Sequence, residues 1–103
     1  MELVETAVFT RQVDAALSEE AYLALQWSLL LAPDAGPVIP GSGGLRKLRW
    51  ALPGRGKRGG ARLIYYWDKP RDRLYLLFLY PKNERADLTR AQLRVLRQLV
   101  GDG

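Results

Sequence analysis

Three short apolar runs, joined only by turn-forming segments, constrain the fold more than any other feature of the sequence. They are LRKLRWAL at 45–52, ARLIYYW at 61–67 and RLYLLFLY at 73–80, and runs of this length and composition are typical of strands. The segments between them, PGRGKRGG and DKPRD, carry turn residues. Parallel pairing needs a crossover of about a dozen residues or more, so these connections predict an antiparallel three-stranded meander.

The segment SEEAYLALQWSLLLAP predicts a helix before the meander. Ser18 can cap this helix and Pro33 ends it. Before it, ELVETAVF favours a short strand and TRQVDAAL favours a short helix, with Thr10 as its candidate cap. The apolar residues that recur at helical spacing in the longer helix, and that we expect to pack on the core, are Leu23, Trp27, Leu30 and Leu31.

A capping box marks the start of a last helix, which runs to about Val100. Thr89 occupies the N-cap and Gln92 the N3 position, while Leu88 and Leu93 form a hydrophobic staple around them. The residues expected on its apolar face are Leu93, Leu96, Leu99 and Val100. The order of strand, two helices, meander and helix indicates an α+β fold, which we expect to be one domain spanning residues 1–103.

The composition excludes several classes of chemistry. The 103 residues include no cysteine and no histidine, which rules out disulfides, thiol catalysis and zinc sites of the cysteine type. Catalysis would have to use Lys, Arg, Tyr, Ser, Thr or carboxylates. No apolar run approaches the roughly 20 residues that span a bilayer, and MELVETAVF does not resemble a signal peptide. We therefore expect a cytoplasmic protein with no membrane partner.

Charge is divided sharply along the chain. Residues 1–45 carry one basic residue, Arg11, against six acids, whereas residues 46–103 carry fifteen basic residues against five acids. A basic surface of this kind favours a polyanionic partner, most simply a nucleic acid, although an acidic protein segment would also fit.

The segment GRGKRG at 54–59 has the G-x-G-x-x-G spacing of a dinucleotide-binding loop. Such a loop needs a helix after it, because the helix N-terminus holds the phosphate, and here an expected strand follows directly. A Walker loop also fails, since Arg58 stands where Ser or Thr would coordinate magnesium. No nucleotide cofactor is expected, and the segment is interpreted as a glycine-rich hairpin that displays Arg55, Lys57 and Arg58.

Cations are expected to gather on one face of the meander. Strand alternation places Lys47 and Arg49 on the same face of the first run, and Arg62 is among the first residues of the next run. Lys82 and Arg85 follow the third run, where a meander could bring them close to the others. Because an unpaired cluster of like charges lowers stability, it is typically kept to bind or act on an anion.

Three motifs within this order of elements, GGLRKLRW, GKRGGARLIYYW and LYPKNERADLT, are similar to those of a known family. The chain resembles, over nearly its whole length, the RelE/HigB toxins of bacterial type II toxin-antitoxin modules. The resemblance implies a RelE-like fold and a metal-independent endoribonuclease without cofactors. Such an enzyme enters the ribosomal A site and cuts mRNA during translation, so the implied partners are mRNA, the ribosome with its rRNA, and a cognate antitoxin protein.

The resemblance also implies a set of catalytic residues: Lys47, Arg49, Arg62 and Lys82. Arg62 is expected to bind the phosphate, Lys47 and Arg49 to stabilise charge and orient the substrate, and Lys82 to orient it or supply a proton. A tyrosine that serves some relatives as base falls on Thr89, so the identity of the base stays open. The residues expected to contact RNA or the ribosome are Arg46, Arg55, Lys57, Arg58 and Arg85.

Two functions remain open from the sequence. The clustered cations favour the ribosome-dependent mRNA endonuclease, since they match the positions of its active site. The alternative is a non-catalytic nucleic-acid-binding module or a toxin like ParE, which shares the fold but poisons DNA gyrase. The absence of histidine and of a matched tyrosine keeps this alternative under consideration.

Overall fold

The computed structural model describes residues 1–52, 60–82 and 87–101. Its elements follow the expected order of strand, two helices, three strands and helix, so the α+β class is confirmed. They are β1 (Glu2–Glu5), α1 (Ala7–Ala16), α2 (Glu19–Leu31), β2 (Arg46–Trp50), β3 (Ala61–Asp68), β4 (Arg73–Pro81) and α3 (Arg90–Val100). The segment GRGKRG lies outside the described residues, between two strands.

The four strands form one mixed sheet in the order β1-β4-β3-β2. β2 pairs antiparallel with β3, and β3 pairs antiparallel with β4, which confirms the meander. β1 pairs parallel with β4. A bulge interrupts the β3–β4 ladder, because Ile64 lies opposite Phe78 while Tyr65 lies opposite Leu76, so that Leu77 is an extra residue in β4.

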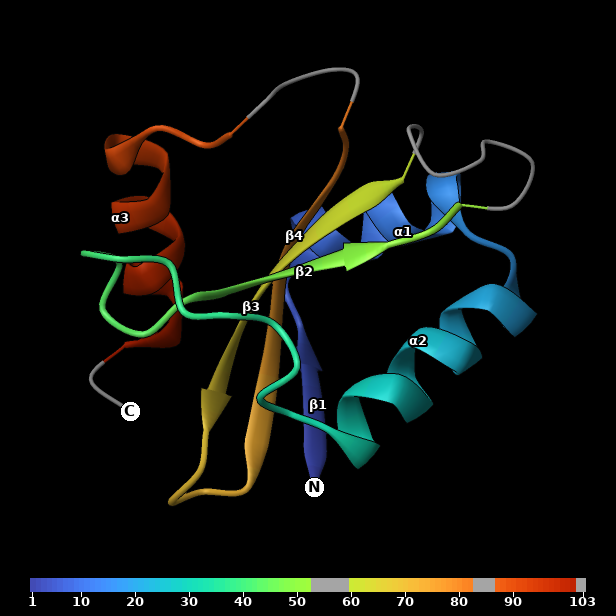
Figure 1. Cartoon of the computed structure of the whole chain (residues 1–103), viewed down its shortest axis with the longest axis horizontal. Coiled ribbons are helices and arrows are strands. Elements are labelled where there is room, and N and C mark those ends of the chain that lie inside the picture. The colour runs from blue at the N-terminus through green and yellow to red at the C-terminus, as the bar shows by residue number, and fades with distance from the viewer. Residues whose placement is uncertain (53–59, 83–86, 102–103) are drawn as a thin grey trace.

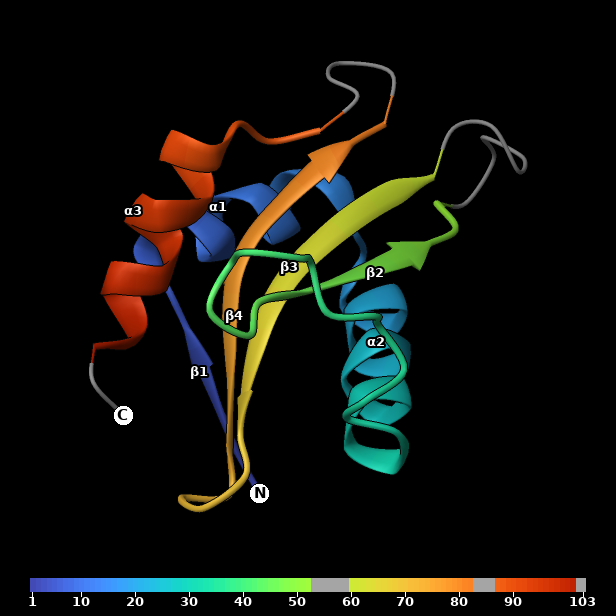
Figure 2. The same ribbon diagram turned by 60° about the vertical axis from the view of Figure 1, so that its left-hand side comes forward.

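Helices cover the two faces of the sheet unequally (Figures 1 and 2). α1 and α2 pack on one face, where Phe9, Val13, Leu25 and Leu29 join the inward residues of β3 and β4 in the larger core. α3 packs on the opposite face over a smaller cluster that includes Leu96 and Val100. The ends of β2 and β3 that adjoin residues 53–59 extend beyond α3, so within the described residues part of this second face has no helix over it (Figure 1).

The start of α1 differs from the expectation for Thr10. Thr6 is the N-cap, and its hydroxyl accepts a hydrogen bond from the backbone N–H of Phe9. Thr10 lies inside the helix and donates to the carbonyl oxygen of Thr6. The same residue type can cap or occupy a helix, and here the cap lies where β1 leaves the sheet, since the Thr6 hydroxyl also donates to the Leu77 carbonyl on β4.

The expected core stripe of α2 is wrong, although Ser18 caps the helix as expected. Leu23, Trp27 and Leu31 are 54%, 57% and 80% exposed, whereas Leu25 and Leu29 are fully buried. Apolar residues occur on every side of this helix, so helical spacing alone could not identify the side that packs. Contacts from outside the helix select it, including the packing of the Tyr22 ring against Phe9 and its hydrogen bond to Glu5.

The start of α3 is confirmed in detail. Thr89 and Gln92 form both hydrogen bonds of the capping box, and Leu88 and Leu93 pack against the smaller cluster. Leu99, expected on the apolar face, is 56% exposed. Within the described residues, none of the helices combines the length and the apolar character needed to cross a bilayer.

Candidate nucleic-acid interface

The register of the meander brings three of the expected catalytic residues to one face of the sheet. Arg49 lies directly opposite Arg62, and Arg62 lies opposite Tyr80 on β4. Directly opposed residues of antiparallel strands point to the same side, and alternation places Lys47 on that side as well. This is the face that α3 covers only in part, and we call these cations with Lys82 the cationic face.

Lys82 extends the same ladder by one step. Its backbone N–H donates to the carbonyl oxygen of Gly60 at 3.0 Å, two residues beyond Tyr80, so strand alternation places its side chain on the cationic face. Lys82 and Arg49 are exposed. The sheet thus presents cations from three adjacent strands at one of its ends.

Arg62 is the most buried of these cations. Its relative exposure is 7%, and its guanidinium Nη1 donates to the carbonyl oxygen of Ala61 at 3.2 Å. In the described part of the chain it forms no ion pair. A buried charge without a paired carboxylate is costly, so its retention favours a role toward an anion.

Gly60 allows the chain to pass close to this arginine. A Cβ at residue 60 would lie 2.9 Å from the carbonyl oxygen of Trp50 and 3.7 Å from Nη1 of Arg62. The first of these separations is shorter than real Cβ contacts, so a larger side chain would displace the end of β2 or the start of β3. Gly60 therefore allows the close approach between the end of β2 and the start of β3, the strand that carries Arg62.

Sequence reasoning missed the carboxylate that faces Lys47. The Lys47 ammonium lies 2.8 Å from Oδ1 of Asp87, which precedes α3. The hydrogen bond and charge of Lys47 lower the pKa of Asp87 below its ordinary value, and the charge of Arg62 acts in the same direction. The two paired residues are 40 positions apart, and no spacing rule connects them.

A hollow of about 280 Å³ adjoins this pair, and Lys47, Tyr80, Asp87 and Arg90 are among its lining residues. Tyr80 is 3% exposed and neighbours Arg62 across the β3–β4 ladder. The pattern in LYPKNERADLT places Tyr80 near the cations but does not single it out, because a strand tyrosine more often fills a core.

Arg46 is not brought to the cationic face. Its cross-strand partner is Tyr65, which points into the larger core, and its guanidinium donates to the carbonyl oxygens of Asp34 and Gly36 at 3.2 and 2.9 Å. Arg46 thus holds the segment that follows α2. The other expected RNA contacts lie outside the described residues: Arg55, Lys57, Arg58 and Arg85.

The side chains of the cationic face are suited to binding and stabilising an anion. Guanidinium groups bind phosphates through directed N–H donors, and a lysine ammonium binds them as a point charge. Among residues 1–52, 60–82 and 87–101, no group of three or more Asp or Glu side chains is arranged to hold a metal ion.

Comparison with known proteins places this arrangement in a family. The family model described as the RelE toxin of the RelE / RelB toxin-antitoxin system matches residues 40–102, a span that includes the meander and α3. The fold is similar to that of the free E. coli toxin RelE carrying two arginine-to-alanine substitutions, with a TM-score of 0.62 and 15% identity over 93% of this chain and 95% of that chain. Since the family match covers more than half of the sequence, the chain belongs to the RelE family of toxins of toxin-antitoxin systems.

Proposed function

We propose that this toxin is a ribosome-dependent endoribonuclease that cuts mRNA in the ribosomal A site and so inhibits translation. The observation that carries the proposal is Arg62, which is 7% exposed and has no ion-pair partner in the described residues. It lies beside Arg49 on a part of the sheet that no described helix covers. A pre-positioned donor of this kind suits the charge that develops on a phosphate under attack.

The reaction needs no nucleophile from the protein. The 2′-oxygen of the RNA attacks the adjacent phosphorus, the bond from phosphorus to the 5′-oxygen breaks, and the products are a 2′,3′-cyclic phosphate and a 5′-hydroxyl. The 2′-hydroxyl proton leaves to a base, and a proton reaches the departing 5′-oxygen. Arg62 binds the phosphate oxygens, and Arg49 stabilises the added negative charge.

Lys47 and Lys82 complete the proposed site. Lys47 orients the substrate and is released from Asp87 when a phosphate takes its place, because both anions compete for one ammonium group. Lys82 orients the strand or supplies the proton to the 5′-oxygen. Removing one well-placed donor to a developing oxyanion lowers the rate by about 10²–10³-fold, which sets the scale expected for Arg62.

Membership of the family implies an antitoxin that neutralises the toxin. We infer that the antitoxin prevents RNA from reaching the cationic face. The test is to pre-mix the toxin with the purified antitoxin, and the expected result is loss of cleavage in the assay described next.

The decisive experiment adds the purified toxin to a defined translating ribosome complex and maps the message by primer extension. We expect new 5′ ends at the codon in the A site, and no cuts in the same message without ribosomes. An intact message at toxin concentrations that still arrest growth would show that the toxin acts on another target, such as DNA gyrase.

Two variants separate catalysis from folding. Arg62→Lys keeps the charge but removes the planar guanidinium, and we expect cleavage to fall about 10²-fold with little change in unfolding temperature. Arg11→Ala removes an exposed arginine from α1, on the other side of the sheet, and we expect it to cleave like the wild type. Full cleavage by Arg62→Lys would remove this residue from the site.

A further inference from the structure

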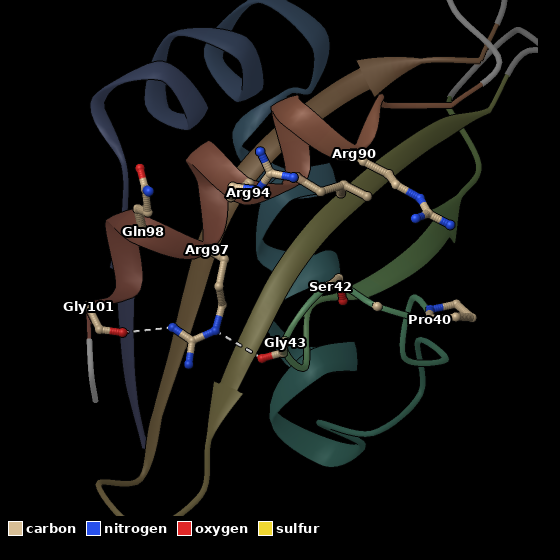
Figure 3. A pocket seen from close by; sticks show the side chains of 10 residues that line it. Pro40, Ser42, Gly43, Arg90, Arg94, Arg97, Gln98 and Gly101 are labelled. Atoms are coloured by element: carbon tan, nitrogen blue, oxygen red, sulfur yellow. Dashed lines mark hydrogen bonds between the residues drawn. The ribbon is translucent and has the colours of Figure 1, made fainter.

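A second hollow lies between α3 and the loop that precedes β2 (Figure 3). Its volume is about 600 Å³. Three arginines of α3 line one side, and residues 40–43 line the other. We call this hollow the arginine groove and define it by Arg90, Arg94, Arg97 and the loop of residues 40–43.

The three arginines share one side of the helix. Positions i, i+4 and i+7 fall on one stripe, and with a rise of 1.5 Å per residue they extend over about 10 Å. In the described part of the chain none of the three forms an ion pair, and no Asp or Glu lines the groove. The stripe is therefore a row of positive charge that no described carboxylate neutralises.

Arg97 forms the wall of the groove and fixes its shape. Its Nε donates to the carbonyl oxygen of Gly43 at 2.9 Å, and its Nη1 donates to that of Gly101 at 2.7 Å (Figure 3). The guanidinium also lies 4.7 Å from the centre of the Tyr66 ring. These contacts hold the loop against α3, so the groove exists before any ligand binds, while the exposed Arg90 and Arg94 keep their donors available.

The arginine groove adjoins the cationic face. The smaller hollow beside Lys47 and the arginine groove share Pro40, Arg90 and Leu93 in their linings. Arg90 therefore lies between the two hollows, and positive charge continues from Lys47 through Arg90 to Arg94. A strand bound at the cationic face could follow this line without crossing a described carboxylate other than Asp87.

We propose that the arginine groove binds the sugar-phosphate backbone of the RNA strand held at the cationic face, through phosphates a few nucleotides away from the cleaved bond. This inference rests on the proposed function. A row of spaced cations that tracks a backbone is the arrangement by which proteins bind single strands without reading their sequence.

An acidic protein segment fits the groove less well. Protein partners bury apolar side chains at the centre of an interface, and the exposed apolar residues of α3, Val95 and Leu99, line a different hollow with Val8 and Phe78. The two sides of α3 thus differ in chemistry, and the arginine side is the one suited to a polyanion.

The test measures binding of a 2′-O-methylated oligonucleotide, which lacks the attacking hydroxyl, by fluorescence anisotropy over a range of salt concentrations. The variant is Arg90→Ala/Arg94→Ala. For an oligonucleotide of about ten nucleotides, we expect at least about tenfold weaker binding at low salt and a salt slope smaller by about 1.4, since each phosphate contact on a single strand releases about 0.7 counterion. For one of about three nucleotides, which is too short to reach both sites, we expect no change.

Two further variants control for total charge and for folding. Arg11→Ala/Lys69→Ala removes the same charge at exposed positions away from the groove, and we expect its salt slope to equal that of the wild type. Arg90→Lys/Arg94→Lys keeps the charges, and we expect it to retain most of the affinity, because lysine also binds phosphate as a point charge.

Three results would overturn the inference: wild-type affinity of the Arg90→Ala/Arg94→Ala variant for the longer oligonucleotide, an equal loss for the shorter one, or binding of a polyglutamate peptide in the groove with no binding of RNA. Its failure is distinguishable from failure of the proposed function. Groove-dependent RNA binding together with intact mRNA on translating ribosomes would contradict only the nuclease, whereas cleavage with no groove dependence would contradict only this inference.

Discussion

The ammonium of Lys47 on β2 and the carboxylate of Asp87 before α3 form an ion pair of 2.8 Å. In the proposed mechanism, Lys47 orients the RNA substrate. The ion pair with Asp87 therefore engages the ammonium group that the RNA would bind. The Asp87 side chain is 70% exposed and that of Lys47 is 31% exposed, and exposed pairs of this kind are weak. A phosphate can therefore displace the carboxylate at small cost.

Replacing Asp87 by Asn should strengthen RNA binding. Loss of the carboxylate removes the competitor for Lys47, so we expect a few-fold higher affinity for a 2′-O-methylated oligonucleotide and an unchanged salt slope, because Lys47 contacts one phosphate in both proteins. Anisotropy titrations at several salt concentrations measure both quantities. Asp14→Asn removes an exposed acid from α1 and serves as the matched control. Equal effects of the two substitutions would mean that only net charge matters.

The Lys47–Asp87 pair should be lost in acid. Lys47 lowers the pKa of Asp87 below 3.8, so in the folded protein the carboxylate stays ionised to lower pH than in the unfolded chain. The pair therefore contributes stability above pH 3.8, and this contribution is lost as the pH falls through the lowered pKa. Carboxyl NMR titration should give a midpoint below 3.8 for Asp87, and Lys47→Met should raise it. An unchanged midpoint in that variant would assign the shift to another cause.

Gly60→Ala should damage both stability and the cationic face. The added Cβ meets the Trp50 carbonyl at 2.9 Å and lies 3.7 Å from the Arg62 guanidinium, so we expect a loss of about 1–3 kcal/mol in urea unfolding. We also expect slower cleavage. Val13→Ala, in the core on the other side of the sheet, provides a destabilised comparison. Equal cleavage by both variants, at equal folded fraction, would show that Gly60 has no part in placing Arg62.

Two leucines of α2 should respond very differently to the same change. Leu29 is fully buried and Leu31 is 80% exposed. We expect Leu29→Ala to cost about 2–5 kcal/mol because it opens a cavity, and Leu31→Ala to stay within about 0.5 kcal/mol. Urea unfolding measures both. A larger loss at Leu31 would restore the stripe that helical spacing indicates.

Thr6 and Thr10 offer the equivalent test for α1. Thr6→Ala removes the N-cap bond to Phe9 and the bond to Leu77, and we expect a loss of about 1 kcal/mol or more. Thr10→Ala removes an exposed hydrogen bond to the Glu5 carboxylate and one to the Thr6 carbonyl, and we expect a change within about 0.5 kcal/mol. Thermal unfolding followed by circular dichroism would detect a reversal of this order.

The start of α3, the meander and the α+β class could be predicted because each depends on neighbouring residues. The capping box needs only Thr89 and Gln92, three residues apart, and the antiparallel pairing follows from connections too short for a crossover. The alternation that places Lys47 and Arg49 on one face is equally local. These features follow from backbone geometry and short-range hydrogen bonds, so the residue pattern contains them.

The remaining features depend on contacts between residues far apart in the chain. The packed side of α2 was chosen by the sheet and by α1, because the helix is apolar on every side. Arg46 was directed to the carbonyls of Asp34 and Gly36, although its charge is the same as that of Arg49. Lys47 pairs with Asp87 across 40 positions of sequence, Arg62 is buried between its cross-strand neighbours, and the arginine groove lies between α3 and the loop that precedes β2. Composition and spacing determined which charges and strands the chain contains. Tertiary packing decided which charges are buried, paired or left facing a groove, because burial and long-range contacts set the free-energy cost of each arrangement.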